Sequence, residues 1–280
     1  MKLKFLINSG YLRLKKNHIK SARLESEILL SKAINKSREF VILNDNYEVS
    51  DKDNDFFKKM LNFRLKGKPV AYITGSKYFW ENEFYLDENV LIPRPDTEII
   101  IEQVLRIFQK KSKINFLEIG TGSGCIILSI LKQRKDFKGT GIDICKRALK
   151  ISKINAHKLG VKNRVRLYKS DIDKFLLGKY DLIISNPPYI NKLDFKYLDR
   201  EVSEFEPKIA LNGGLDGISE IRKVIKKSSE LIKNGGKLIL EIAHNQKKDV
   251  KQLLFNYGFY VNSVKKDLAN NDRCIISTKI

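Results

Sequence analysis

The stretch "INFLEIGTGSGCIILSILKQR", residues 114–134, decides the fold class of this sequence. Its first apolar run has the length of a strand, and the run after the glycines is long enough for a helix. Gly120, Gly122 and Gly124 lie between the two runs and allow the backbone to turn tightly. A strand that passes through a glycine-rich turn into a helix is the first half of a βα unit.

The same alternation continues to the end of the sequence. Further strands are expected over 137–143, 164–171, 180–189 and 235–243, with two late strands after them. Helices are expected over 99–108, 125–134, 145–160, 217–232 and 246–259. Repeated βα units predict an α/β, Rossmann-like fold with a mostly parallel sheet of seven strands and helices on both faces.

The segment before this sheet has a different pattern. Residues 1–74 carry apolar residues at helical spacing, so we expect a small N-terminal helical-bundle domain there. Ser21 and Ser50 are the expected N-caps of two of its helices. The first of these two helices should place Leu24, Ile28 and Leu29 on one buried face.

The segment "GSKYFWENEFYLDENVLIP", residues 75–93, alternates aromatic and polar residues. This alternation predicts a β-hairpin that links two domains. The expected organisation is therefore a helical substrate-recognition domain over 1–74, a hairpin linker over 75–93 and an α/β domain over 94–280.

Composition and charge exclude several classes of protein. No apolar run is long enough to span a bilayer. Three separated cysteines indicate reduced thiols of a cytoplasmic protein, and three scattered histidines give no metal site. The formal net charge is +21, but lysine outnumbers arginine 41 to 13 along the whole chain. Arginine is the usual choice for bidentate phosphate recognition, so we interpret this charge first as compositional bias. An acidic or RNA-associated partner attracted by the general positive field is the alternative.

Two acidic residues end the next two expected strands after the glycine-rich turn. Asp143 can accept hydrogen bonds from both hydroxyls of a ribose. Asp171 can accept from an adenine amino group while Ile172 covers the ring. An Asp at a strand end is often only a helix cap or a turn residue. Ligands bind at the carboxyl edge of an open α/β sheet, however, and the three features follow one another along that edge.

The glycine-rich turn has the spacing GxGxG, with Cys125 where a dinucleotide fingerprint would need its third glycine. A compact nucleoside with an amino-acid tail therefore suits the turn better than a pyrophosphate. Glu118, just before the turn, either meets a cationic group of the ligand or holds the turn together. The pattern resembles the class I S-adenosylmethionine-dependent methyltransferases. The expected cofactor-binding residues of the turn are Gly120, Thr121, Gly122, Ser123 and Gly124.

The expected strand over 180–189 ends in "SNPPY", on the same sheet edge. Pro187 and Pro188 restrict the backbone and offer no N–H group. The segment can therefore present two acceptors, the Asn186 side-chain oxygen and the Pro187 carbonyl. Two fixed acceptors suit an NH₂ group, and Tyr189 can stack on the planar group that carries it. Asn-Pro is also a common turn signal, so a simple strand-ending turn is the alternative.

Such an acceptor pair would assist methylation of an amide. An amide nitrogen shares its lone pair with the carbonyl, which makes it a poor nucleophile. Holding both N–H groups favours the geometry in which the lone pair points at the methyl carbon. Holding the two reactants in line can recover roughly 7–11 kcal/mol of a bimolecular barrier. The expected catalytic residues are Asn186, Pro187 and Tyr189, and Pro188 completes the expected substrate-binding set.

Over nearly its whole length the sequence resembles the PrmC/HemK family of peptide chain release factor glutamine N(5)-methyltransferases. The resemblance rests on the motifs "LIPRPDTE" at 91–98, "EIGTGSG" at 118–124, "SNPPYI" at 185–190, "FEP" at 205–207, "GGLDG" at 213–217 and "NNDR" at 270–273. It implies methyl transfer from S-adenosylmethionine to the glutamine of the Gly-Gly-Gln motif in release factors. It also implies that Gly120–Gly124, Asp143 and Asn186 belong to the cofactor site.

Two positions depart from the family pattern. Ile172 replaces a residue that is often aromatic in relatives, which weakens the expected stacking on adenine. Ala269 and Asn270 stand where Gly-Asp is common, and this change concerns packing more than chemistry.

Two other functions compete with this interpretation. A methyltransferase acting on an exocyclic amine of a nucleic acid base would also need acceptors for two N–H groups. No target-recognition domain follows the sheet, and base flipping would call for more aromatic surface than Trp80 suggests. A non-catalytic adaptor would have no use for the Asn186–Tyr189 segment. We therefore expect a cytoplasmic monomer that acts on release factors and needs neither stably bound nucleic acid nor a membrane.

Overall fold

The computed structural model describes residues 1–109 and 113–280. The chain forms two compact units, Met1–Gly75 with Asp199–Phe205, and Ser76–Leu198 with Glu206–Ile280. The first unit is called the helical unit below and the second the sheet unit. The helical unit therefore contains a short segment from late in the sequence in addition to the expected residues 1–74.

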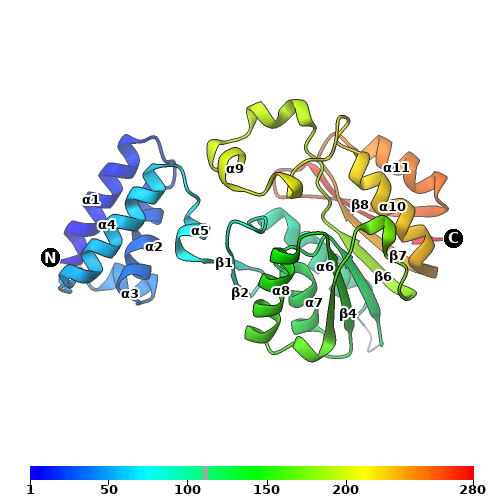
Figure 1. Ribbon diagram of the computed structural model, residues 1–280, viewed down its shortest axis with the longest axis horizontal. Helices are drawn as coiled ribbons and strands as arrows, with labels where there is room; N and C mark the ends of the chain where they lie inside the picture. Colours follow the sequence, from blue (N-terminus) through cyan, green and yellow to red (C-terminus); the bar gives the residue numbers. More distant parts are fainter. Residues whose placement is uncertain (110–112) are drawn as a thin grey trace. The chain divides into compact units, whose positions relative to one another are not determined.

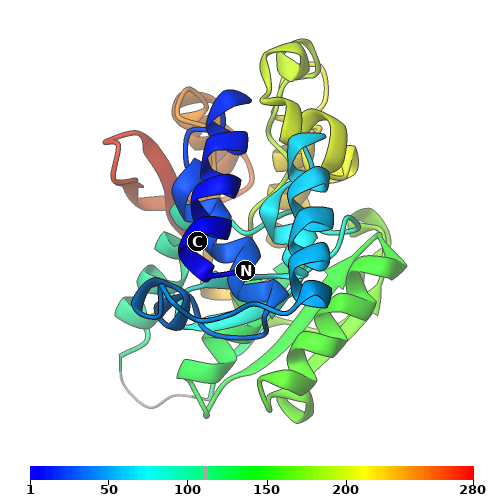
Figure 2. The same ribbon diagram turned by 90° about the vertical axis from the view of Figure 1, so that its left-hand side faces the viewer.

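Residues 3–74 of the helical unit form helices that enclose one apolar core, blue to cyan in Figure 2. Its helices are α1 (Leu3–Lys16), α2 (Ala22–Ala33), α3 (Arg38–Leu43), α4 (Asp51–Leu65), α5 (Val70–Thr74) and α9 (Arg200–Phe205). The Ser50 side chain accepts from the Asp53 backbone N–H at 3.2 Å, so the predicted cap of α4 is confirmed.

The predicted face of α2 is confirmed at Leu29, which is buried, and wrong at Leu24. Leu24 is 42% exposed, whereas Glu25 lies on the buried face beside Leu29. Glu25 can be buried because it accepts two hydrogen bonds from Arg64 of α4, at 2.6 and 3.2 Å. Ser21 occupies the N-cap position of α2, but its hydroxyl donates to the Glu25 side chain at 3.1 Å and does not cap the helix.

The short α9 belongs to the helical unit through the same buried arginine. Arg64 forms an ion pair with Glu201 of α9 at 3.0 Å in addition to its pair with Glu25. Sequence reasoning placed this segment in the α/β domain because it is flanked by that domain on both sides. The ion pair is a tertiary contact that no local pattern signals.

The predicted hairpin is present but shorter than expected. Strands β1 (Ser76–Phe79) and β2 (Asn82–Tyr85) pair in antiparallel fashion within the sheet unit. The Tyr85 backbone N–H donates to Asn155 Oδ1 of the sheet unit at 2.8 Å. The chain after β2 continues without regular structure to Pro95.

The predicted seven-stranded, mostly parallel sheet is confirmed (Figure 1). The strands lie in the order β5-β4-β3-β6-β7-β9-β8, and β9 is antiparallel to both neighbours. They are β3 (Asn115–Ile119), β4 (Lys138–Asp143), β5 (Val165–Lys169), β6 (Tyr180–Ser185), β7 (Ile232–Glu241), β8 (Phe259–Lys266) and β9 (Asp272–Lys279). The strand order reverses between β3 and β6, which is the position where open α/β sheets bind ligands.

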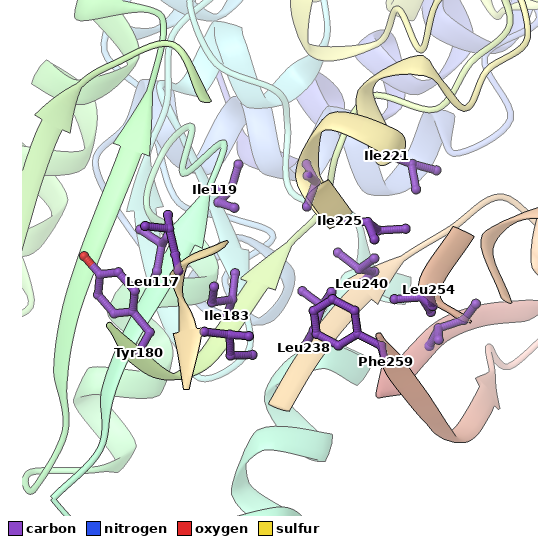
Figure 3. Packing of buried hydrophobic residues seen from close by; sticks show 14 of the residues in the cluster. Leu117, Ile119, Tyr180, Ile183, Ile221, Ile225, Leu238, Leu240, Leu254 and Phe259 are labelled. Atoms are coloured by element: carbon purple, nitrogen blue, oxygen red, sulfur yellow. The ribbon is translucent and has the colours of Figure 1, made fainter. Parts of the chain in front are cut away.

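Helices cover both faces of the sheet. They are α6 (Glu98–Ile107), α7 (Cys125–Gln133), α8 (Lys146–Lys158), α10 (Ser219–Leu231) and α11 (Lys247–Asn256). Figure 3 shows one core, in which residues of α10 and α11 such as Ile225 and Leu254 pack on Ile183 and Leu238 of the strands. The β3 residue Phe116 lies on the other face, beside α7.

In the described residues no helix is long and apolar enough to cross a membrane. The three cysteines are free, and Cys274 is buried whereas Cys125 and Cys145 are half-buried. Residues 1–109 and 113–280 contain no cluster of histidine, cysteine and acidic side chains that could hold a metal ion.

Candidate active site

A cavity of about 370 Å³ lies at the carboxyl ends of β3, β4 and β6, within the sheet unit. This volume lies in the range of pockets that bind small ligands, roughly 300–1,000 Å³. The register of the sheet aligns Ile119 of β3 with Ile142 of β4 and Ser185 of β6, so the three strand ends meet. The predicted site residues that line the cavity are Gly120, Gly122, Asp143, Asp171, Ile172, Asn186, Pro187 and Pro188.

The glycine-rich turn contributes backbone rather than side chains to this cavity. Gly120 and Gly122 have φ of +76° and +54°, and a Cβ at either position would project into open space. The two glycines therefore keep room for a ligand beside the backbone. Glycine is required at position 124 for close packing instead, because a Cβ there would lie 2.8 Å from Leu128 of α7.

The two polar residues of the turn point into the protein. Thr121 and Ser123 are buried and do not line the cavity. The Thr121 hydroxyl donates to Glu118, and the Ser123 carbonyl accepts from Asn155 Nδ2 at 2.9 Å. Thr121 therefore holds the turn in shape through its side chain, and Ser123 does so through its backbone carbonyl.

Asp143 ties the turn to the end of β4. Its two carboxylate oxygens accept from the backbone N–H groups of Gly122 and Cys145, each at 2.8 Å. Burial raises the pKa of Asp143 above its ordinary value, and these two hydrogen bonds oppose the shift. Each oxygen keeps a second lone pair, so the side chain can still accept from a ligand in the cavity.

Asp171 and Ile172 line the cavity beside Asp143. The Asp171 side chain accepts from the Asp173 backbone N–H at 3.0 Å and caps the short 3₁₀ helix Ile172–Lys174. Ile172 packs against the main core of the sheet unit and is only half-buried. The pair thus offers one carboxylate and one apolar surface to the same ligand, as expected for an adenine site.

Glu118 does not line the cavity and is only 1% exposed. Its carboxyl group accepts from Thr121 and from the backbone N–H of Ile127 in the first turn of α7. Of the two roles considered for Glu118, the structure therefore favours holding the turn together. Burial is the main cause that raises its pKa from 4.5 to about 8.

This pKa shift predicts a pH dependence of stability. A carboxyl group with a raised pKa stabilises the fold fully below its unfolded pKa, about 4.5, and loses that contribution as the pH rises through about 8. Relative to Glu118→Gln, the wild type should therefore lose free energy of unfolding between pH 5 and pH 8, by up to about 1.4 kcal/mol per pH unit. Urea denaturation of both proteins across this range measures the difference, and parallel curves would contradict the assignment.

The segment Asn186–Tyr189 forms a rigid elbow after β6, called the elbow below. Asn186 Nδ2 donates to Thr97 Oγ1 at 3.2 Å. Among the described residues no donor reaches Asn186 Oδ1 or the Pro187 carbonyl, although both residues line the cavity. The two acceptors that the sequence predicted thus have no donor among the described residues, and the residues that carry them line the cavity.

Tyr189 is directed differently from the other elbow residues. It does not line the cavity, and its hydroxyl donates to Glu241 Oε1 at 3.1 Å. Burial and the nearby Glu241 carboxylate raise the pKa of Tyr189. Its hydroxyl therefore anchors the elbow to β7, whereas stacking of its ring on a substrate stays a prediction.

The "GGLDG" loop packs against the backbone at the end of the elbow. The Gly213 N–H donates to the Ile190 carbonyl at 2.9 Å, and a Cβ on Gly213 would lie 2.7 Å from the Tyr189 Cα. Gln246 Nε2 bonds the carbonyls of Tyr189 and Gly217, at 3.2 and 2.8 Å. Glycine is needed at 213 because the two backbones touch there.

Models of two protein families match the sequence. The PrmC N-terminal domain matches residues 6–75, and a methyltransferase domain matches residues 110–276. A release factor glutamine methyltransferase of Clostridium acetobutylicum is 35% identical over 282 residues, which cover 100% of this chain and 99% of that protein. The chain belongs to the release factor glutamine methyltransferase family.

Other relatives support the same family assignment. A release factor glutamine methyltransferase of Fusobacterium nucleatum is 36% identical over 98% of this chain and 78% of that protein. A bifunctional methyltransferase of Rickettsia typhi is 34% identical over 98% of this chain, which spans only 56% of that longer relative. A methyltransferase of Pyrococcus furiosus, 21% identical with a TM-score of 0.53 over 70% of this chain and 88% of that one, shares the fold alone.

Sequence reasoning assigned no role to two residues near the elbow of this glutamine methyltransferase. Thr97 of "PRPDTE" accepts from Asn186, and Glu241 at the end of β7 accepts from Tyr189. The signal for Thr97 was its place in a family motif, but its partner lies 89 residues away along the chain. Glu241 gave a weaker signal, a single acid at the end of an apolar strand.

The same motif is joined to "FEP" by an ion pair. The Glu206 carboxylate accepts from the Arg94 guanidinium and from the backbone N–H of Ile92, the latter at 3.1 Å. Pro207, the next residue, lines the cavity. The contacts between "PRPDTE" and "FEP" therefore stabilise the part of the cavity wall that contains Pro207.

Proposed function

We propose that the chain transfers a methyl group from S-adenosylmethionine to the side-chain amide nitrogen of the glutamine in the Gly-Gly-Gln motif of peptide chain release factors. The single observation that carries this proposal is the elbow, which offers Asn186 Oδ1 and the Pro187 carbonyl, both unpartnered, at the wall of the cavity. The names of the full-length relatives support the same substrate.

The residues of the cavity fit the cofactor. Gly120 and Gly122 leave open space beside the backbone, and Asp143 and Asp171 offer carboxylate oxygens toward ribose and adenine. Ile172 offers an apolar surface for the adenine ring. When bound, S-adenosylmethionine supplies an activated methyl group on a positively charged sulfur, which leaves as a neutral thioether.

The elbow acts on the substrate amide. Asn186 Oδ1 and the Pro187 carbonyl accept one N–H each, which fixes the amide plane and turns the nitrogen lone pair toward the methyl carbon. The bound cofactor, which Asp143 and Asp171 would hold, would supply the methyl group to this nitrogen, and the substrate amide would give up one N–H proton to water. No strong base is required, because the leaving group carries no negative charge.

The helical unit is the proposed docking domain for the release factor. Its match to the PrmC N-terminal domain over residues 6–75 supports this role. The protein is further proposed to act as a cytoplasmic monomer without stably bound nucleic acid. The alternative substrate, an exocyclic amine of a nucleic acid base, is not favoured by the relatives.

Incubation with S-adenosylmethionine labelled in the methyl group tests the proposal. Release factor and total RNA are offered in separate reactions. Label on the release factor, and its loss when the glutamine of the Gly-Gly-Gln motif is replaced by alanine, is the expected result. Label on RNA alone would overturn the proposal and support the nucleic acid alternative.

A further inference from the structure

A second cavity, of about 380 Å³, lies in the sheet unit at the amino ends of the strands. It is lined by Asn115, Lys138 and Tyr180, the first residues of β3, β4 and β6, and is called the distal cavity below. The last residue of β4, Asp143, lines the active-site cavity instead. The length of β4 separates the two cavities by about 17 Å. A ligand in the distal cavity would therefore not overlap with S-adenosylmethionine.

The distal cavity is lined by basic side chains. They are Lys138, Arg164, Arg166 and Lys179. Among the described residues no acidic side chain lines it with them. The active-site cavity has the opposite character, because three acids, Asp143, Asp171 and Glu220, line it with the single basic residue Lys223. The distal cavity therefore suits an anion, whereas the active-site cavity suits a positively charged sulfonium.

Two of the basic side chains have no partner in the protein. Within residues 1–109 and 113–280, neither Lys138 nor Arg166 makes a side-chain hydrogen bond or an ion pair. Both residues are exposed and both line the distal cavity. Their donors are therefore available to a ligand that enters the cavity.

Two acids beside the distal cavity are already paired. Asp181 accepts from the backbone N–H of Asn115 at 2.9 Å and forms an ion pair with a lysine that does not line the cavity. Asp136 forms an ion pair with Arg134 at 2.9 Å. Burial lowers the pKa of Arg164, and the charge of Asp136 opposes this shift only in part. Arg164 uses one N–H group for the Arg134 carbonyl, at 2.9 Å, which leaves the others for a ligand.

The loop before β6 adds backbone donors to the cavity wall. Gly178 and Lys179 line the cavity, and in the described part of the chain their N–H groups donate no hydrogen bond. Gly178 has φ of +87°, and the hydroxyl of Tyr180 donates to the Leu177 carbonyl at 2.9 Å, which fixes the loop against β6. Backbone N–H groups in such turns commonly contribute to anion-binding sites.

We propose that the distal cavity binds a small molecule that carries a diphosphate group. The guanidinium groups of Arg164 and Arg166 can each hold phosphoryl oxygens in bidentate fashion. A diphosphate concentrates several negative charges on one compact group, which matches a cluster of basic side chains around one cavity. A nucleic acid backbone carries a single charge on each phosphate and would neutralise the cluster less completely. Because this site lies apart from the active site, its role does not depend on the identity of the methyl-transfer substrate.

Calorimetry of the full chain with inorganic pyrophosphate, at constant ionic strength, tests the site. Arg166→Gln is the informative variant, because Arg166 is exposed and makes no ion pair in the described residues, so the fold should persist without it. We expect this variant to bind pyrophosphate about ten-fold more weakly or worse, since a hydrogen bond to a charged group is lost. Inorganic phosphate should bind the wild type more weakly than pyrophosphate does. Saturating S-adenosylmethionine should leave the affinity for pyrophosphate unchanged.

Arg106→Gln is the matched control. Arg106 of α6 is also exposed and makes no side-chain hydrogen bond or ion pair in the described residues, but it lines neither cavity. Its replacement lowers the net charge of the protein as much as Arg166→Gln does. We expect Arg106→Gln to keep the wild-type affinity. If pyrophosphate were attracted only by the general positive field, both variants would weaken its binding equally.

Several outcomes would overturn the proposal. Absence of pyrophosphate binding to the wild type would do so, as would equal weakening in the two glutamine variants. Competition between pyrophosphate and S-adenosylmethionine would place the anion in the active-site cavity. Tighter binding of a single-stranded RNA oligonucleotide that also depends on Arg166 would identify nucleic acid as the ligand instead. If Arg166→Gln does not fold, Lys138→Gln replaces it with the same expected loss, and an unchanged affinity there would reject the site.

Discussion

Asn186→Ala is expected to lower the rate constant of methyl transfer by about 10²–10³-fold, the range seen when one preorganised hydrogen-bonding group is removed from a reacting centre. The variant loses the acceptor that fixes one N–H of the substrate amide, so the lone pair is no longer held in line with the methyl carbon. Single-turnover methylation of release factor measures the rate constant, and calorimetry with S-adenosylmethionine should show a much smaller change in affinity.

Asn212→Ala is a suitable control for this variant. Asn212 lines the same cavity, but its side-chain oxygen accepts from the Gly214 N–H at 3.0 Å. A wild-type rate in Asn186→Ala would remove the elbow mechanism. Equal losses in the two variants would instead point to a general disturbance of the cavity wall.

Asp143→Ala is expected to weaken S-adenosylmethionine binding by about 10²-fold or more. Two hydrogen bonds from ribose hydroxyls to a charged acceptor contribute roughly 1.5–3 kcal/mol each. The same substitution also frees the N–H groups of Gly122 and Cys145, which hold the turn against β4. Both effects act on cofactor affinity, so the dissociation constant from calorimetry is the measurement.

Asp173→Ala provides the matched comparison, since Asp173 is an exposed acid two residues after Asp171 that does not line the cavity. The affinity of the Asp173→Ala variant for S-adenosylmethionine should equal that of the wild type. Asp143→Asn keeps one acceptor oxygen, so its affinity for S-adenosylmethionine should lie between those of Asp143→Ala and the wild type. Unchanged affinity in Asp143→Ala would refute the ribose assignment even if the rate of methyl transfer fell.

Patterns that depend on neighbours along the chain were predicted well. The turn 120–124 follows β3 and precedes α7 because glycine spacing and apolar run lengths are local properties. The carboxyl ends of parallel strands share one edge, so the sequence alone predicted that Asp143, Asp171 and Asn186 lie together, and all three line the same cavity.

Contacts between distant segments were predicted poorly. The buried face of α2 was misjudged because Glu25 looks like a surface residue until Arg64 neutralises it. The segment 199–205 was assigned to the wrong neighbours for the same reason, since its ion pair with Arg64 bridges more than 130 positions of sequence. Predicting a buried face from an amphipathic pattern supposes that charged side chains face water. A charged side chain that is paired with an opposite charge can be buried, so the prediction fails at such a residue.

The sequence by itself determined the βα alternation, the glycine-rich turn and the donor-free elbow, because each follows from the backbone preferences of adjacent residues. Only the tertiary structure decided which way the elbow's amide faces. Thr97 and Asn186 lie 89 residues apart along the chain, and the hydrogen bond from Asn186 Nδ2 to Thr97 Oγ1 exists only because folding brings the two segments together. A hydrogen bond has a donor and an acceptor end, and which end a side chain uses depends on what lies beside it.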